Sequence, residues 1–242
     1  LVAEKVDLIW VPGTAVAQAA REATASIPIV FALVSDPVQS GFVRSLASPG
    51  TNMTGMSLLS PEMWGKRLEL LLEVRADVRR LGVLAQPGDP ATAVHLPQIR
   101  SAAVLSGRDV LVVEAGNAAH FPAAFGKLKE WRADALFIAE TGFFLFHRGT
   151  IIDEATRNRW PTVNSTRQYA EAGGLISYGV DYAENCKRSA AYVDRVLKGA
   201  APASLPVQQP ARFELVVNLK AATALGIAIP PAILARADEV IE

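Results

Sequence analysis

Cysteine and histidine are scarce in this chain, and their scarcity limits its chemistry. The single cysteine cannot form an internal disulfide. The three histidines (His95, His120 and His147) lie far apart, without the spacing of metal ligands. The sequence also lacks G-x-G-x-x-G, P-loop and G-x-S-x-G motifs. We therefore expect no metal site, no cofactor and no catalytic residue, and we predict that the protein is not an enzyme.

An excess of charge is absent too. Twenty-four basic residues balance twenty-four acidic ones, so no strong field favours nucleic acid or an anionic membrane. No apolar run approaches the ~18 residues of a membrane span. The 242 residues suffice for one large domain or two small ones, and half of them are hydrophobic. These features are typical of a globular chain with no nucleic-acid partner.

Short apolar runs alternate with helical patterns along the chain. This alternation predicts α/β architecture, with parallel sheets covered by helices on both faces and joined by right-handed crossovers. We expect strands at 6–11, 27–33, 80–85, 110–113, 135–139, 162–164, 175–178 and 213–217. We expect helices at 15–25, from Ser60 onward, and at 91–105, 119–131, 144–158, 167–172, 181–197, 219–225 and 231–241.

One long stretch, 34–60, has neither a helical nor a strand period. It is too apolar for a solvated linker, and connections of this length are usually functional or disordered. We interpret its end, 52–60, as the place where the chain leaves one lobe for another past a cleft. The predicted lobes are 1–57 with about 181–217, and 58–180. The helices of 218–242 are expected near the hinge, without an assigned lobe.

The beginning of the chain reads as the tail of a helix at Leu1–Lys5, leading into the first strand. Doubly wound lobes rarely start there. We therefore expect that a first βαβ unit, and any export signal, precede this chain. An exposed sheet edge in the first lobe would then be free to pair with a second copy as a homodimer.

Ligand-binding candidates follow from the rule that open α/β sheets bind ligands beyond the carboxyl ends of their strands. Gly13, Thr14 and Ala15 follow the first strand, where helix amides can bind a carboxylate or phosphate; the alternative is that Thr14 is a plain N-cap. Asp36 follows the second strand and either pairs with a ligand ammonium or caps a turn. Further candidates are the hydroxyls of Thr54 and Ser57, whose alternative role is turn chemistry.

The second lobe offers Gln86, Asp89, Glu140, Tyr178 and Asp181 at its strand ends. Glu140 precedes a cluster of phenylalanines, so it can bind a cation or an aromatic ligand, although core packing explains the rings more simply. Asp181 is expected to cap the long helix that follows, and this role does not prevent it from facing the cleft.

Two helical patterns separate expected core from expected surface. After an N-cap at Ser60, the helix places Trp64, Leu68, Leu71 and Leu72 on a buried face, and Lys66, Arg67, Glu69 and Glu73 on a solvated one. In the long helix, Cys186 shares an apolar stripe with Ala190, Val193 and Leu197. We therefore predict that Cys186 is a core residue, not a nucleophile.

Several stretches resemble the substrate-binding proteins of ABC importers, in particular the tryptophan/tyrosine-type family. The similarity runs in order along essentially the whole chain. The matching stretches are Val11–Ala15, Ile27–Phe31, Ser35–Val38, Asn52–Ser57, Gly65–Leu71, Ala172–Gly179, Asn218–Ala222, Ile229–Pro231 and Arg236–Ile241. One departure is Gln86-Pro87-Gly88-Asp89-Pro90, where the family commonly has Asn-Pro-x-Asn-Pro.

The resemblance implies a type I periplasmic-binding-protein fold whose two lobes close on a small ligand. It also implies an extracytoplasmic location, a membrane permease as partner, and an amino acid or other small carboxylate as ligand. A sensor of the same fold, feeding a signalling partner, is the alternative. A small-molecule enzyme using Glu140 or Asp36 as base, and a DNA-binding repressor, are less consistent with the residue inventory.

Overall fold

A computed structural model describes residues 1–58 and 60–242, with residues 60–62 described by their backbone alone. The chain forms two compact units. Unit 1 consists of Leu1–Pro61, Asp89–Val94 and Val180–Arg212. Unit 2 consists of Glu62–Gly88, His95–Gly179 and Phe213–Glu242, so the C-terminal helices belong to unit 2. Among the described residues, no helix is long and apolar enough to cross a membrane.

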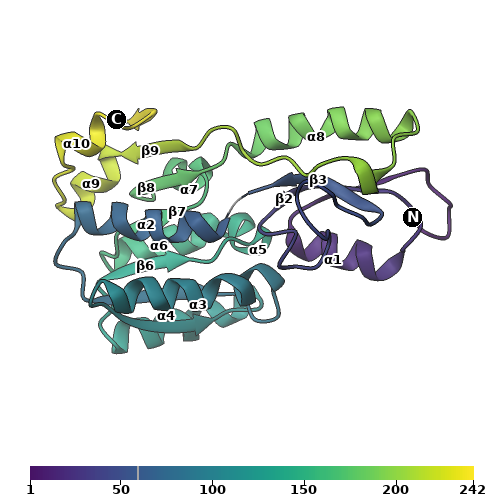
Figure 1. Ribbon diagram of the computed structural model, residues 1–242. Coiled ribbons are helices and arrows are strands. Elements are labelled where there is room, and N and C mark those ends of the chain that lie inside the picture. The colour runs from purple at the N-terminus through teal and green to yellow at the C-terminus, as the bar shows by residue number, and fades with distance from the viewer. Residues whose placement is uncertain (59) are drawn as a thin grey trace. The chain divides into compact units, whose positions relative to one another are not determined.

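Unit 1 contains a three-stranded parallel sheet in the order β1-β2-β3. Its α-helices lie on opposite faces of this sheet (Figure 1). The elements of unit 1 are β1 (Ile9–Pro12), α1 (Thr14–Ala23), β2 (Ile29–Val34), β3 (Met53–Ser57), α8 (Tyr182–Leu197) and the 3-10 turn η2 (Pro202–Ser204).

Each face of this small sheet has its own apolar cluster. Because strand side chains alternate in direction, Ile29 and Phe31 of β2 pack with Ala17 of α1, whereas Val30 packs with Tyr192 of α8. Residues within the stretch 34–60 add to the core: Phe42, Val43 and Met53 are buried against the α1 side. The apolar character of that stretch therefore reflects packing inside unit 1.

Unit 2 contains a seven-stranded sheet in the order β10-β9-β8-β7-β6-β4-β5. Its strands are parallel except at the β8–β9 pair, which is antiparallel. The chain forms Val180–Arg212 of unit 1 after β8, and β9 then begins opposite the end of β8. The strands are β4 (Arg80–Ala85), β5 (Asp109–Glu114), β6 (Ala135–Ile138), β7 (Thr162–Asn164), β8 (Ile176–Gly179), β9 (Glu214–Asn218) and β10 (Glu239–Ile241).

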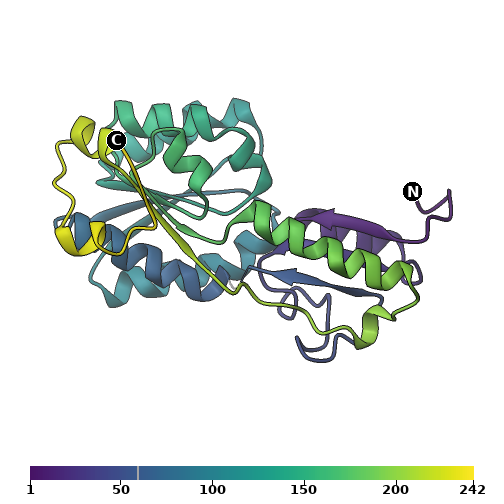
Figure 2. The ribbon, with the colours of Figure 1, turned by 90° about the horizontal axis from the view of Figure 1, so that it is seen from above.

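Helices cover both faces of the sheet of unit 2. Figure 2 shows α2 and α3, in blue, on one face and α4 and α6, in teal, on the other. The two faces enclose one large core built around β4, β6 and β7. The remaining helical elements of the chain are α2 (Ser60–Val74), α3 (Pro90–Leu105), η1 (Ala118–His120), α4 (Phe121–Glu130), α5 (Gly142–Phe146), α6 (Arg148–Arg157), α7 (Arg167–Glu171), α9 (Leu219–Leu225) and α10 (Pro231–Leu234), of which the first residues of α2 and α3 belong to unit 1.

The predicted α/β class and its parallel sheets are confirmed, but several elements differ from the sequence prediction. The stretch 34–60 contains strand β3, because its residues pair with β2 although two of the five are glycine or serine. The helix expected over 144–158 is two helices that meet at His147, and the first begins at a Thr141 N-cap. The side chain of Ser60, the expected N-cap, lies outside the described part of the structure.

The C-terminal prediction was partly wrong. The helix expected over 231–241 ends at Leu234, and the last residues form β10 instead. Arg167 explains part of this arrangement, because its guanidinium donates to Glu214 of β9 at 3.0 Å and to Glu239 of β10 at 2.5 Å. The ion pairs attach the final strand to the sheet.

The buried stripe of α8 was predicted one residue out of place. The buried residues are Asn185, Ser189, Tyr192 and Val196, whereas Cys186 is half-buried and Leu197 is 58% exposed. Polar groups explain the shift, since the Ser189 hydroxyl accepts from Trp10 Nε1 at 2.8 Å and Asn185 bonds to two strands of the sheet. Burial raises the pKa of the Cys186 thiol.

Candidate functional site

The sheet of unit 2 has a topological switch point between β4 and β6. β4 connects through α3 to β5 on one side, and the chain returns through α4 to β6 on the other. At such a point the loops diverge from the carboxyl ends of the strands, which is where open α/β sheets bind ligands. The structure brings Gln86, after β4, and Glu140, after β6, to this edge, as predicted from the sequence.

Arg67 of α2 is the main residue that the sequence prediction placed wrongly. It was expected on a solvated face, yet it is 2% exposed. Its Nε donates to the Tyr178 carbonyl at 2.7 Å, and its Nη1 lies 3.4 Å from Glu140 Oε2. A buried guanidinium is tolerated when it is paired and hydrogen-bonded. Arg67 therefore joins α2 to the ends of β6 and β8, and it compensates the charge of Glu140.

The Trp64 ring of α2 packs beside Arg67 and contacts further rings. The Trp64 ring stacks on Phe137 at 5.0 Å and tilts against His95 at 5.5 Å, and the Arg67 guanidinium lies 5.8 Å from its centre. Trp64 Nε1 is buried without a hydrogen-bond partner among the described residues. The side chain of Tyr178 is half-buried and tilts against Phe213.

Gly179 shows how closely the strand ends of unit 2 approach one another. A Cβ at this position would lie 1.8 Å from the Ser165 carbonyl oxygen and 3.1 Å from Arg67 Nη2. No side chain fits in that space. The absence of a side chain allows β8 to end against β7 while Arg67 reaches the neighbouring carbonyl of Tyr178.

Asp89 is a buried helix cap. Its Oδ1 accepts from Thr92 N at 2.9 Å, directly before Pro90 at the first position of α3. Burial raises the pKa of its carboxyl group above the usual aspartate value, and the hydrogen bonds from Thr92 and Ala91 oppose this shift. Gln86, the other residue predicted in this loop, is half-buried.

In unit 1, β1 ends at the N-terminus of α1. Gly13 is the N-cap, with φ 83°, and no side chain caps the helix. The prediction of Thr14 as N-cap was therefore wrong: its hydroxyl accepts from Ser35 N at 3.1 Å and thereby joins α1 to the end of β2. Ala15 is exposed, and the first turn has no acidic residue. The first-turn amides and the helix dipole thus favour an anion.

β2 is irregular near its end, where its register with β3 shifts between Phe31 and Val34. Leu33 has φ 56°, an uncommon value for a residue with a branched side chain, and its N–H donates to Asn185 Oδ1 at 3.2 Å. Asp36 Oδ1 accepts from Val38 N and Gln39 N at 3.0 and 2.9 Å. Of the two roles that the sequence left open for Asp36, the structure shows turn capping.

The two hydroxyl candidates of β3 are both buried. Thr54 is fully buried and its hydroxyl donates to the Leu205 carbonyl at 2.6 Å, which holds β3 to the 202–210 segment. Ser57 is 2% exposed, and its carbonyl accepts from Asn185 Nδ2 at 3.4 Å. Asp181 caps α8 as predicted, accepting from Ala183 N and Glu184 N, and it is exposed.

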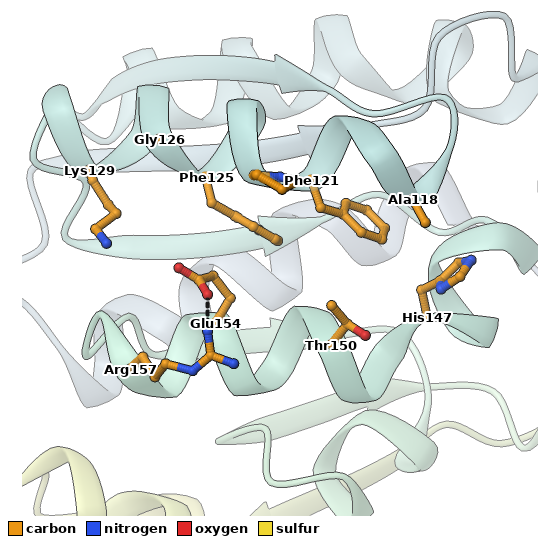
Figure 3. Close-up of a pocket in the computed structure, with 10 residues that line it drawn as sticks. Ala118, Phe121, Phe125, Gly126, Lys129, His147, Thr150, Glu154 and Arg157 are labelled. Atoms are coloured by element: carbon orange, nitrogen blue, oxygen red, sulfur yellow. Dashed lines mark hydrogen bonds and ion pairs between the residues drawn. The ribbon is translucent and has the colours of Figure 1, made fainter.

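A groove of about 370 Å³ lies elsewhere on unit 2, between α4 and α6 (Figure 3). Phe121 and Phe125 point from α4 toward α6, which carries the Glu154–Arg157 ion pair at the other side of the groove. Each phenylalanine is only 3% exposed, so a ligand would remove little apolar surface from water. The groove is thus a weaker candidate than the strand ends. The described residues also contain no group of three or more His, Cys, Asp or Glu side chains placed to hold a metal ion.

The architecture of the two units defines a type I periplasmic-binding-protein fold. A family model described as ABC transporter substrate binding protein matches residues 1–241. The chain therefore belongs to the ABC transporter substrate-binding protein family.

Individual relatives agree with this assignment. A conserved domain protein from Vibrio cholerae is 33% identical with a TM-score of 0.92, over 99% of this chain and 80% of that one. An ABC domain in complex with L-Trp from Streptococcus pneumonia is 26% identical with a TM-score of 0.92, over 100% and 81%. The tyrosine-binding protein of Clostridioides difficile is 27% identical over 90% of this chain, which spans 62% of that relative's length.

Proposed function

We propose that the chain is the solute-binding component of an ABC importer, extracytoplasmic in location, with a membrane permease as partner. Its ligand would be a small molecule that carries a carboxylate, and an aromatic amino acid is the first choice. Support comes from the family and from two relatives, one named for tyrosine binding and one solved with L-Trp. The proposed ligand-contact residues lie in the loops at the carboxyl ends of the strands.

The observation that carries this proposal is the uncapped N-terminus of α1. Helix N-termini leave backbone N–H groups without an intrahelical partner. Here Gly13 provides no side-chain acceptor, and Thr14 uses its hydroxyl for Ser35 N. A ligand carboxylate at Thr14 and Ala15 would accept these hydrogen bonds and would also complement the helix dipole.

The ammonium of an amino acid needs an acidic partner. Glu140 is already paired with Arg67, so we assign this role to Asp36 or Asp181, both of which reach the surface. Gln86 and the Tyr178 ring remain proposed ligand-contact residues of unit 2, and Ser57 remains one of unit 1. We leave Thr54 out of the proposed contacts because its hydroxyl already donates to the Leu205 carbonyl, and Asp89 because it caps α3.

The test measures ligand binding by calorimetry after a negative charge is introduced where the ligand carboxylate is proposed to bind, at the N-terminus of α1. L-Tryptophan and L-tyrosine are titrated into the wild-type protein and into Ala15→Glu and Ala15→Gln. An acidic side chain in the first turn interacts favourably with the helix dipole but repels a bound carboxylate. The Ala15→Glu variant should therefore stay folded, while its affinity for both amino acids falls by about tenfold or more. Ala15→Gln, of the same size, should retain much more affinity.

Two outcomes would contradict different parts of the proposal. If the wild-type protein bound no amino acid or small carboxylate, the proposed ligand class would be wrong. If it bound tryptophan and Ala15→Glu bound equally well, the ligand class would stand, but the carboxylate would not lie at α1.

A further inference from the structure

Arg67 occupies a position that packing alone does not require. It lies on α2, whereas its two polar contacts lie at the ends of β6 and β8, 73 and 111 residues away in sequence. β7 separates these strands in the sheet. One planar guanidinium thus links both flanks of β7 at the edge where the candidate ligand-contacting residues emerge. Arginine is suited to this task because its donors form a rigid fork.

The pair is buried deeply enough for its charge balance to matter. The exposed fractions of the Arg67 and Glu140 side chains are 3% and 7%. Removing one partner of such a pair leaves a buried charge without compensation, whereas replacing both by neutral groups is often tolerated. Arg148 carries a second charge near this region. Burial is the main cause that raises the pKa of the Tyr169 hydroxyl, the Glu140 carboxylate raises it further, and Arg148 opposes the shift.

We propose that Arg67 is a positioning and selectivity residue of the ligand site, an inference that rests on the proposed function. Through the Tyr178 carbonyl it fixes the end of β8, and through the Glu140 carboxylate it fixes the loop after β6. By compensating Glu140 it also keeps this edge from attracting cationic ligands that lack a carboxylate. Arg67 acts through these neighbours and need not touch the ligand.

The experiment compares two ligands that differ only in the carboxylate. L-Tryptophan and tryptamine are titrated by calorimetry into wild type, Arg67→Met, Glu140→Gln and the double variant Arg67→Met/Glu140→Gln, with thermal unfolding recorded for each. Arg67→Met should bind tryptophan at least about tenfold more weakly, because a small displacement of contact groups is costly. Its affinity for tryptamine relative to tryptophan should rise, because Glu140 then attracts the ammonium.

The double variant separates charge from position. It should lose the rise in relative tryptamine affinity, while tryptophan binding stays weak because the Tyr178 carbonyl is no longer held. It also keeps the inference testable if Arg67→Met does not fold, because neutralising both members of the pair preserves the fold more readily. Arg67→Lys keeps the positive charge but not the forked guanidinium. It should keep the wild-type ratio of tryptamine affinity to tryptophan affinity, and its tryptophan affinity should lie between those of Arg67→Met and wild type.

Three results would each contradict a different part of this inference. If the double variant were folded and bound tryptophan as tightly as wild type, Arg67 would have no positioning role. If the tryptamine-to-tryptophan ratio were the same in wild type and Arg67→Met, it would have no role in selectivity. Wild-type protein that bound neither tryptophan nor tyrosine would instead contradict the proposed ligand, and this inference with it.

Discussion

Asp89 shows how a single residue can serve the fold at an electrostatic cost. It caps α3 through Thr92 N, yet burial raises the pKa of its carboxyl group. A raised folded-state pKa means that the folded protein holds the proton more tightly than the unfolded chain. The ionised form therefore lowers stability, and this penalty grows as the pH rises from the unfolded aspartate pKa, about 3.9, through the higher folded value.

Substituting Asp89 separates these two contributions. Asp89→Asn keeps a good N-cap without the charge, so it should be at least as stable as wild type at pH 7, and its advantage should vanish below about pH 4. Asp89→Ala removes the cap and should lose about 1 kcal/mol. Urea unfolding at both pH values measures these effects, and an Asn variant that is less stable at pH 7 would show that the carboxylate contributes more than capping.

Arg67 illustrates why the sequence could not predict the whole site. The positions of Trp64, Leu68 and Leu71 correctly predicted the buried face of α2. Arginine beside lysine and glutamate is most often solvated, and only the packed strand ends supply the Tyr178 carbonyl and the Glu140 carboxylate that make its burial possible. Tertiary partners of this kind leave no local signal in the sequence.

Among the elements, β3 depends on a close approach of two backbones. A Cβ at Gly55 would lie 1.9 Å from the Phe31 carbonyl oxygen, and Gly55 has φ 152°. The sequence prediction missed this strand because glycine has low strand propensity. Pairing with β2, together with the Thr54–Leu205 hydrogen bond, outweighs that local preference.

A pair of glycine substitutions tests this reading of β3. Gly55→Ala should destabilise the protein by about 3 kcal/mol or more, because the backbone of β2 has to move. Gly65→Ala is the control: nothing lies within 4 Å of its Cβ position in α2, so alanine should stabilise by about 0.5–1 kcal/mol. Chemical denaturation measures both. Equal stabilities of Gly55→Ala and wild type would mean that the strands do not approach this closely.

For the whole molecule, the sequence predicted the α/β class more readily than the order and direction of the strands. The spacing of apolar residues, together with the glycines and prolines that end each element, identifies helices and parallel strands, because both signals depend on local residues. The antiparallel entry of β9 and the late strand β10 depend on where the chain returns after Val180–Arg212, which no local pattern encodes.

The separate cores lead to a prediction about unfolding. The one cluster around β4, β6 and β7 belongs to unit 2, and the two clusters around β2 belong to unit 1. Calorimetry should therefore show more than one transition, with a calorimetric enthalpy that exceeds the van't Hoff value. Gly55→Ala should lower the transition of unit 1 more than the other. A single transition with equal enthalpies would contradict independent cores.

Unit 1 is assembled from segments that are distant in the chain, and this has a consequence during synthesis. Leu1–Pro61 leave the ribosome before α8, which covers one face of their sheet and belongs to Val180–Arg212. Until that later segment emerges, Val30 and Met56 have no helix over them. During synthesis these strands therefore expose an apolar face to water. We expect a holding chaperone to bind this part of the nascent chain.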